Sequence, residues 1–195
     1  MKKLMIAACA VAFAAAAHAA SCNWSGSGVT TTGAKDGPAS WGVYLIDSAK
    51  LSTTQLATLM TSKEDGAKAA LSSAIDAAKV ATTPGIAVGT TAGRWQNNGF
   101  TLPSGYSQGD SVTFYTLILD QGGAQDKGAY FLSQTMSGQV SDSTALLMGF
   151  TSQSGKSWTS YDFSAEPPPG PVPEPTSAML LLLGVAGLAL KRKQA

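Results

Sequence analysis

A proline-rich stretch near the C-terminus limits how far the folded domain of this chain can extend. Residues 166–175 read Glu-Pro-Pro-Pro-Gly-Pro-Val-Pro-Glu-Pro and hold six prolines in ten positions. Proline has no backbone N–H and fixes φ, so the stretch suits neither a helix nor a sheet and is expected to be extended. At about 3.1 Å per residue it spans roughly 30 Å. The folded domain is therefore expected to end at residue 164, with residues 165–171 as a linker.

An apolar segment follows the linker and ends in three cations. Residues 176–190 carry no charge. The segment is shorter than the ~20 residues of a stable membrane span, which favours a transient membrane helix over a permanent anchor. Cations resist transfer across the bilayer, so this end is expected to stay in the cytoplasm with everything upstream outside. The three cations are Lys191, Arg192 and Lys193.

The order of these parts resembles the PEP-CTERM sorting domain of Gram-negative bacteria. The resemblance covers residues 172–195, which are 24 of 195 residues. It implies an exported protein whose tail is recognised by an exosortase, a membrane-embedded relative of cysteine proteases, in bacteria that usually also make exopolysaccharide. An ordinary single-span anchor is the alternative interpretation of the tail. The residues that carry the motif are Val172, Pro173, Glu174, Pro175, Thr176 and Ser177.

The first 19 residues have the three parts of a secretory signal. Two lysines precede an apolar run, which ends in a site made of small residues. Cleavage after Ala19 places Ala17 and Ala19 at the positions that the peptidase reads, and the mature chain then begins at Ala20. One alternative uses Cys22 as a lipid-modified N-terminus, although the preceding Ala-Ala-Ser lacks the bulky aliphatic residue that usually opens a lipobox.

Removal of the signal restricts the chemistry that is left. Cys9 and the only histidine, His18, lie in the signal, so Cys22 is the single cysteine of the mature chain. An internal disulfide, histidine-dependent catalysis and histidine metal sites are thereby excluded. Residues 20–38 are predicted to form a flexible N-terminal segment. In such a segment Cys22 is a bystander or forms an occasional intermolecular disulfide.

The charge of the exported body argues against nucleic acid as a partner. Residues 20–170 hold eight basic and eleven acidic residues, a net charge of about −3. No basic patch is present that would attract a phosphate backbone. The roughly 130 residues that remain are enough for one domain with a modest core.

Residues 39–164 predict a mainly β, antiparallel sandwich-like domain with a short two-helix insertion. Alternating apolar residues indicate a strand at 40–47, and residues 111–119 form a central strand that is apolar on both faces. A capping-box spacing starts a helix at Ser52, and a repeat of that spacing at Thr61 starts a second one. An Asn-Gly pair at 98–99 predicts a hairpin. A strand at 129–135 is expected to pair with the strand at 111–119. A last hairpin is expected from the strands at 144–150 and 158–163.

The candidate binding residues are aromatic side chains and carboxylates. Trp24, Trp95 and Tyr106 are expected in or beside loops, where rings can stack on sugars. A loop that carries Asp120 and Asp126 offers oxygens for calcium, but its spacing does not match an EF-hand. Acid–base hydrolysis of glycans would need two carboxylates across a cleft. The aspartates at predicted strand ends or in loops are Asp47, Asp110, Asp120, Asp142 and Asp162.

The sequence as a whole predicts a protein of the cell surface or extracellular matrix. Its expected role is structural or adhesive, without catalytic residues, cofactor or metal, in an exopolysaccharide or biofilm setting. The expected partners are an exosortase-type enzyme, the membrane through the helix at about 176–190, and exopolysaccharide. A polysaccharide-binding module or a carboxylate-based glycan hydrolase is the rival interpretation.

Overall fold

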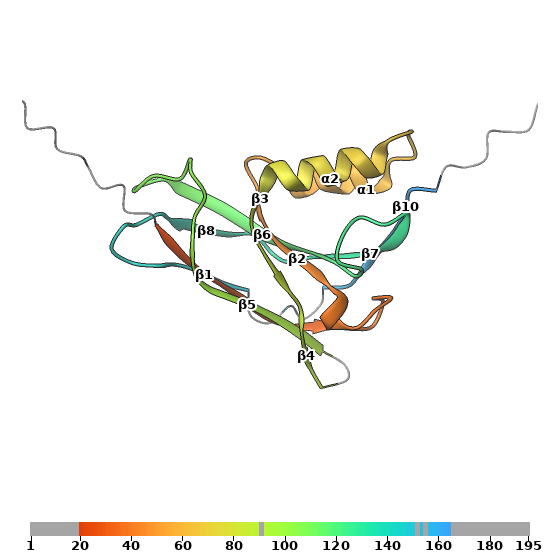
Figure 1. Cartoon of the computed structure of the whole chain (residues 1–195), viewed down its shortest axis with the longest axis horizontal. Helices are drawn as coiled ribbons and strands as arrows, with labels where there is room; N and C mark the ends of the chain where they lie inside the picture. The colour runs from red at the N-terminus through yellow and green to blue at the C-terminus, as the bar shows by residue number, and fades with distance from the viewer. Residues whose placement is uncertain (1–19, 90–91, 151–152, 154–155, 165–195) are drawn as a thin grey trace, which may run out of the picture.

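The computed structural model describes residues 20–89, 92–150, 153 and 156–164 (Figure 1). This part of the chain is mainly β, with two α-helices, as the sequence predicts. The elements are β1 (Ser21–Thr30), η1 (Pro38–Ser40), β2 (Gly42–Asp47), α1 (Thr53–Thr61), α2 (Ala67–Ala78), β3 (Lys79–Pro84), β4 (Ile86–Val88), β5 (Ala92–Thr101), β6 (Ser111–Leu119), β7 (Lys127–Leu132), β8 (Met136–Gln139), β9 (Leu146–Phe150) and β10 (Thr159–Asp162).

Two sheets and the helix pair form three layers. One sheet has the strand order β4-β5-β1-β9, and the other has the order β10-β7-β6-β2-β3, with β8 also pairing with β6. Residues of both sheets share one apolar cluster. A second cluster lies between the helices and the six-stranded sheet, which the helices cover in Figure 1. Both clusters lie within residues 20–164, so this part of the chain carries its own core.

The central strand of the six-stranded sheet is buried on both faces. In β6 the side chains of Phe114 and Ile118 join the cluster between the sheets, whereas Tyr115 and Leu117 join the cluster under the helices. Successive side chains of a strand point to opposite faces, so one apolar strand can serve two cores. The prediction of a central strand at 111–119, paired with the strand near residue 130, is confirmed.

The first helix begins with the capping box that the sequence predicts. The Ser52 hydroxyl oxygen accepts the N–H of Gln55, and the Gln55 side chain accepts the N–H of Ser52. The second start site is wrong by several residues. Ser62 ends α1, and α2 begins after Gly66, whose φ of 83° only glycine adopts easily. The apolar face of α2 packs inward, with Ala67, Leu71, Ile75 and Ala78 buried.

The segment predicted to be flexible is instead a central strand. β1 lies between β5 and β9 and forms the middle of the four-stranded sheet. Cys22, Trp24 and Val29 are completely buried. Gly26 is also interior, since a Cβ there would lie 2.0 Å from the Trp95 ring. The described fold therefore includes residues 20–38 and does not begin at residue 39.

The Asn-Gly pair at 98–99 makes a bulge, not the predicted hairpin. β5 runs through the pair and stays hydrogen-bonded to β1. The register shifts between Cys22 and Trp24, opposite the pair, and Gly99 has a φ of 68°. The Asn23 side chain accepts the N–H of Gly99 at 2.7 Å. A glycine at positive φ inside a strand is typical of a bulge that adds one residue.

The last two strands also do not form the predicted hairpin. β9 pairs with β1 in a parallel direction, whereas β10 pairs with β7 in the other sheet. The two segments thus close different layers of the domain. The purely antiparallel sandwich becomes one antiparallel sheet and one sheet with a single parallel pair.

The two ends of the described chain lie toward opposite ends of the domain. The start of β1 and the residues after β10 are far apart along the long axis of Figure 1. Among the described residues no helix is long and apolar enough to cross a membrane. The expected helices of the signal and of the tail, at 1–19 and 176–190, lie outside these residues.

Candidate functional site

The residues of the two terminal signals are only partly covered by the structure. Ala17 and Ala19, the sorting motif at 172–177 and the cations at 191–193 lie outside the described residues. Ala20 is buried, with 6% of its surface exposed, and its carbonyl oxygen accepts the N–H of Leu102 at 2.9 Å. The expected cleavage site therefore adjoins the folded domain directly. Cleavage is expected to precede the docking of β1, since a peptidase needs extended, accessible backbone.

Trp24 and Trp95 lie in the core and not in loops, which corrects the expectation that they bind sugars. They are 0% and 1% exposed, and their ring centroids are 6.4 Å apart. The indole nitrogen of Trp24 donates to Oγ1 of Thr116 at 3.0 Å, which connects the two sheets. A ring enclosed in this way offers no face to a glycan, so of the three candidates only Tyr106 still reaches the surface.

Tyr106 is half-buried and is held by contacts on several sides. Its hydroxyl donates to Oδ2 of Asp47 at 2.7 Å, and its ring meets the edge of Phe114 with centroids 5.8 Å apart. Nζ of Lys50 lies 5.3 Å from the ring centroid. Burial, followed by the hydrogen bond and the charge of Asp47, raises the pKa of Tyr106 above its ordinary value. The hydroxyl therefore acts as a hydrogen-bond donor and not as an acid.

A cavity of about 300 Å³ brings Tyr106 together with two of the candidate aspartates. Asp47 and Asp110 both line it, although they are far apart in the sequence. Oδ1 of Asp47 accepts the N–H of Ala49 at 2.9 Å, and Oδ2 of Asp110 accepts the N–H of Ser107 at 2.7 Å. These bonds fix both carboxylates. The cavity can therefore present fixed acceptors beside an aromatic ring to the hydroxyl groups of a ligand.

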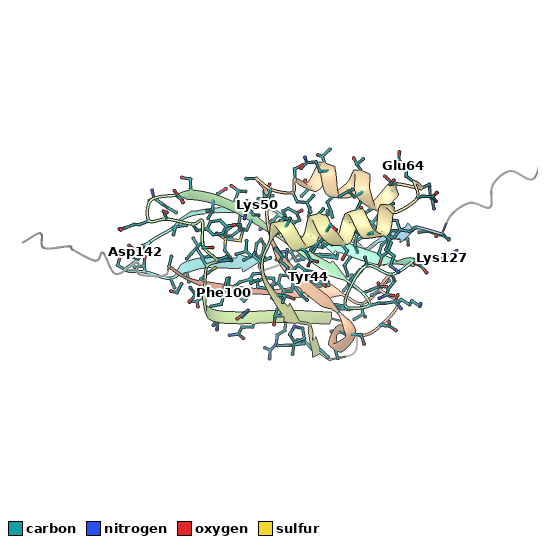
Figure 2. All side chains as sticks on the ribbon, turned by 45° about the horizontal axis from the view of Figure 1, so that its top comes forward. Tyr44, Lys50, Glu64, Phe100, Lys127 and Asp142 are labelled. Atoms are coloured by element: carbon teal, nitrogen blue, oxygen red, sulfur yellow. The ribbon has the colours of Figure 1, made fainter. Side chains whose placement is uncertain are left out.

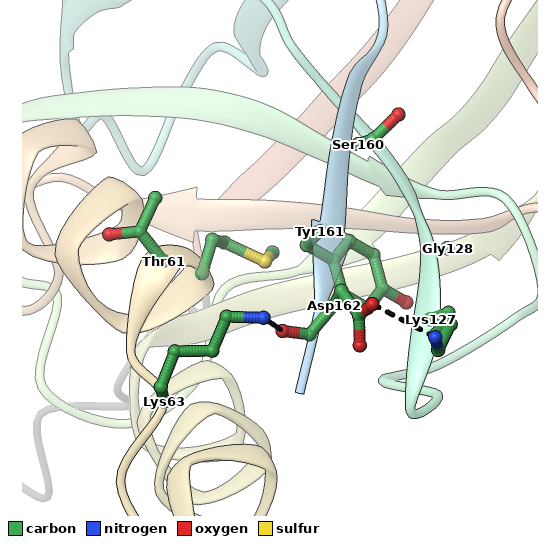
Figure 3. Close-up of a pocket in the computed structure, with 8 residues that line it drawn as sticks. Thr61, Lys63, Lys127, Gly128, Ser160, Tyr161 and Asp162 are labelled. Atoms are coloured by element: carbon green, nitrogen blue, oxygen red, sulfur yellow. Dashed lines mark hydrogen bonds and ion pairs between the residues drawn. The ribbon is translucent and has the colours of Figure 1, made fainter. Parts of the chain in front are cut away.

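A larger cavity of about 530 Å³ lies where α1 ends beside β10 (Figure 3). Nζ of Lys63 donates to the backbone oxygen of Asp162 at 2.5 Å, and Nζ of Lys127 lies 3.0 Å from Oδ2 of Asp162. Hydrogen bonds from Ser164, and then from Lys127, lower the pKa of the Asp162 carboxyl. Lys63 and Lys127 thus both contact Asp162, and these contacts attach the turn after α1 and the start of β7 to β10.

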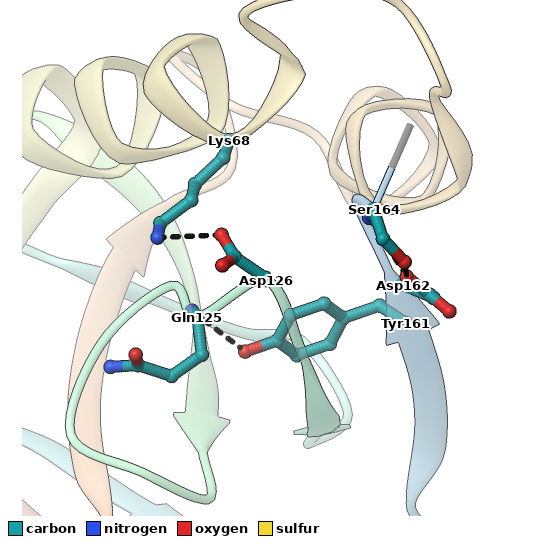
Figure 4. A network of polar contacts seen from close by, with 6 residues as sticks. All are labelled: Lys68, Gln125, Asp126, Tyr161, Asp162 and Ser164. Carbon is teal, nitrogen blue, oxygen red and sulfur yellow. Dashed lines mark hydrogen bonds and ion pairs between the residues drawn. The ribbon is translucent and has the colours of Figure 1, made fainter. Parts of the chain in front are cut away.

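The loop with the calcium candidates is held by separate contacts (Figure 4). Asp126 pairs with Lys68 of α2 at 2.9 Å, and the N–H of Gln125 donates to the Tyr161 hydroxyl at 3.2 Å. Asp120 is completely buried, and its Oδ2 accepts the N–H of Lys35 at 3.1 Å. The two carboxylates therefore support different parts of the fold. Within the described residues no three His, Cys, Asp or Glu side chains form a metal-binding group.

Cys22 has a different environment from the flexible one that was expected. Its side chain is 0% exposed in β1, which has a strand on each side. Burial raises the pKa of the thiol from 9.0 to about 12. The interior position is incompatible with a lipid on the sulfur and with a disulfide to another chain.

The Cys22 thiol is expected to resist alkylation in the folded protein at neutral pH and to react completely after unfolding. Only the thiolate reacts readily, and the raised pKa keeps the thiol protonated. Unfolding returns the pKa toward 9, so the stability that the protonated thiol contributes is full below about pH 9 and falls as the pH rises toward 12. Mass spectrometry after iodoacetamide, with and without guanidinium, checks this. Rapid labelling without denaturant would contradict the buried position.

One comparison with known proteins gives a match. A family model described as the PEP-CTERM protein-sorting motif matches residues 171–193. This confirms the resemblance on which the interpretation of the tail was based, and it indicates an exported surface protein sorted by an exosortase-type enzyme. No curated protein matches the chain, and no solved structure matches it either.

Proposed function

We propose that this chain is a structural or adhesive component of the cell surface or extracellular matrix, acting in an exopolysaccharide or biofilm setting and not as an enzyme. The sorting motif at residues 171–193 carries the proposal, because it follows directly on a proline-rich spacer and a complete folded domain. Such an order places a compact domain on an extended stalk at the point of processing. The expected N-terminus is Ala20, and the apolar tail with its cytoplasmic cations holds the chain until the enzyme acts.

The place where the chain leaves the domain supports the presentation of the domain on a stalk. The chain leaves the domain after β10, at the end that also carries Glu64 and Lys127, whereas Asp142 lies at the opposite end (Figure 2). The end near Asp142 is thus the end of the described domain farthest from the point where the chain leaves it. The three ion pairs of the described residues join neighbouring elements of one fold, namely Lys68 with Asp126, Lys79 with Asp76, and Lys127 with Asp162.

Replacing Pro173, Glu174 and Pro175 together by alanine is expected to abolish processing, so that the chain stays with the membrane fraction. These residues form the extended segment that a processing enzyme reads. A matched control replaces the linker residues Pro167, Pro168 and Pro169 by alanine and is expected to be sorted like the parent. Immunoblots of membrane, surface and medium fractions from the native host measure the distribution. Normal sorting of the motif variant would overturn the assignment of the motif.

The structural role is tested in the same strains. A strain that lacks the chromosomal copy is expected to form a matrix that breaks up under lower shear, and the intact chain is expected to restore its cohesion. The motif variant is expected not to restore it, because the domain remains at the membrane. Unchanged cohesion in the deletion strain would contradict a structural role even if sorting is normal.

A polysaccharide-binding or glycan-hydrolysing module is the second candidate. The cavity that joins Tyr106, Asp47 and Asp110 favours it, since sugar sites commonly combine a ring with carboxylates that accept hydrogen bonds. A glycan array and a hydrolysis screen on residues 20–164 test this role. Binding or turnover that disappears in Asp110→Asn, but persists in a Tyr44→Phe control, would replace the structural proposal.

A further inference from the structure

The large apolar side chains that remain exposed are confined to one sheet. In the described part of the chain they are Ile86, Val88 and Leu147, with 37%, 47% and 69% of their surfaces exposed. The first two lie in β4 and the third in β9, which are the two outer strands of the four-stranded sheet. Isolated exposed apolar residues are normal on a protein surface. Here they coincide with the two outer strands of a single sheet.

Among the residues that the structure describes, both of these edges have a side without a hydrogen-bonded strand partner, although η1 lies near β4 and β8 lies near β9. Within the described residues β4 pairs only with β5, and β9 pairs only with β1, so each strand has one side without a strand partner. Neither Ile86–Val88 nor Leu146–Phe150 contains a charge or a proline. Proteins normally place charged residues, prolines or covering elements at such edges to prevent pairing with other chains.

The six-stranded sheet shows the usual protection. Its outer strand β10 carries Asp162, which pairs with Lys127. Lys63, in the turn after α1, also contacts Asp162. Its other outer strand, β3, begins at Lys79 and ends at Pro84. The outer strands of this sheet therefore carry charges or a proline, which β4 and β9 lack.

The two open edges have the same direction. β9 is parallel to β1, and β4 is antiparallel to β5, which is itself antiparallel to β1, so β4 and β9 run the same way. Two copies in the same orientation can thus join β9 of one to β4 of the next as a parallel pair. Within the sheet, β9 lies beside residues 22–26 of β1, whereas β4 lies at the level of residues 27–30 of β1. If β9 of one copy pairs with β4 of the next, successive copies are therefore shifted along the strand direction by about five residues, roughly 17 Å.

The charges beside the two edges have opposite signs. Arg94 lies directly across from Ile86 in the pairing of β4 with β5. Asp142 is the charged residue nearest to β9 in the sequence, four positions before Leu146. Neither residue takes part in the ion pairs formed among the described residues. A cation thus lies on the strand next to β4 and an anion lies four positions before β9, and opposite charges of this kind would favour association of unlike edges.

We propose that copies of this chain associate head to tail, with β9 of one copy pairing with β4 of the next. An interface between unlike edges joins copies in series, and it produces open chains when the rotation between copies does not close a ring. A pairing of three to five residues is small, so association is weak in solution and increases when many copies are held on one surface. The inference depends only on the two sheet edges. It goes beyond the proposed structural role at the cell surface, which a monomer could also perform.

The test compares single charge substitutions at each edge of residues 20–164, the part that carries its own core. Leu147→Lys blocks the β9 edge, Val88→Lys blocks the β4 edge, and Ile86→Lys is an independent second variant of β4. Ser27→Lys places the same charge at an exposed position of the central strand β1 and is the matched control. All four positions are exposed, so circular dichroism and thermal unfolding are expected to match the parent.

Sedimentation velocity over a wide range of protein concentration gives the readout. The parent and Ser27→Lys are expected to form a growing series of oligomers, and each edge variant alone is expected to remain monomeric. A mixture of Leu147→Lys with Val88→Lys is expected to form dimers and nothing larger, because one intact edge of each kind remains. Monomers in the parent at every concentration would overturn the proposal. Dimers formed by either edge variant alone would also overturn it, since they require pairing of like edges.

Discussion

Trp24→Ala is expected to lower the free energy of unfolding by about 3–5 kcal/mol, the range for removal of a large buried aromatic side chain. The ring is 0% exposed and packs beside Trp95 in the cluster between the two sheets. The substitution also removes the hydrogen bond to Thr116, a residue that is itself completely buried. Urea unfolding of residues 20–164, followed by circular dichroism, measures the change.

Leu147→Ala is the matched control for this prediction. Leu147 lies in the same sheet but is 69% exposed, so its removal is expected to change the free energy of unfolding by no more than about 0.5 kcal/mol. Both proteins are compared at low concentration. A loss below about 1 kcal/mol for Trp24→Ala would place the ring outside the core and would restore Trp24 as a candidate for sugar stacking.

Gly42→Ala is expected to destabilise the domain by about 1–3 kcal/mol, the usual cost of overpacking an interior position. A Cβ at Gly42 would lie 2.4 Å from the carbonyl oxygen of Gly122, which is a backbone atom that cannot rotate away. The loop at Gly122 is also held there, since the Tyr44 hydroxyl donates to the same oxygen at 2.6 Å. The added methyl group therefore has to displace either β2 or the loop.

Gly123→Ala is the control that separates the effect of overpacking at Gly42 from the general effect of replacing a glycine by alanine. No atom lies within 4 Å of the position that its Cβ would occupy. Alanine at such a site restricts the unfolded chain and is expected to raise the free energy of unfolding by about 0.4–1 kcal/mol. Equal effects of Gly42→Ala and Gly123→Ala in urea unfolding would contradict the close contact between β2 and the loop.

Local patterns in the sequence predict those elements whose cause is local. The capping box at Ser52 marks the start of α1, and alternation in residues 40–47 places Trp41, Val43 and Leu45 in one cluster. These features depend on a hydrogen bond between near neighbours or on the two-residue repeat of a strand. Residues 111–119 are predictable as a central strand for a related reason. Their side chains are apolar on both faces of the strand, so each face has to be covered by another layer of the fold.

The β1 strand could not be predicted because its sequence is rich in serine and glycine, and its buried residues range from Gly26 to Trp24 in size. Its sequence, Ser-Cys-Asn-Trp-Ser-Gly-Ser-Gly-Val-Thr, has the composition of a flexible linker. Gly26 occupies an interior position because the Trp95 ring fills the space of a side chain. The large residue that completes this part of the core thus lies about 70 positions away, on β5. Periodicity within β1 alone does not contain that information.

Long-range pairing also explains the errors in the candidate site. An Asn-Gly pair serves a hairpin and a bulge equally well, and only the pairing of β5 with β1 decides between them. The same pairing buries Trp95, which a hairpin would have left beside a turn. Tyr106 and Asp47 meet because the loop after β5 returns to the end of β2, a contact that spans 59 positions. No motif in the sequence marks that contact.

The most direct test of export and sorting is the intact mass of the protein recovered separately from the membranes and the medium of its native host. The account predicts a product that begins at Ala20 and ends between residues 173 and 176, with no lipid added to Cys22. A product that keeps residues 191–193 and stays with the membranes would contradict sorting and would leave an ordinary tethered envelope protein.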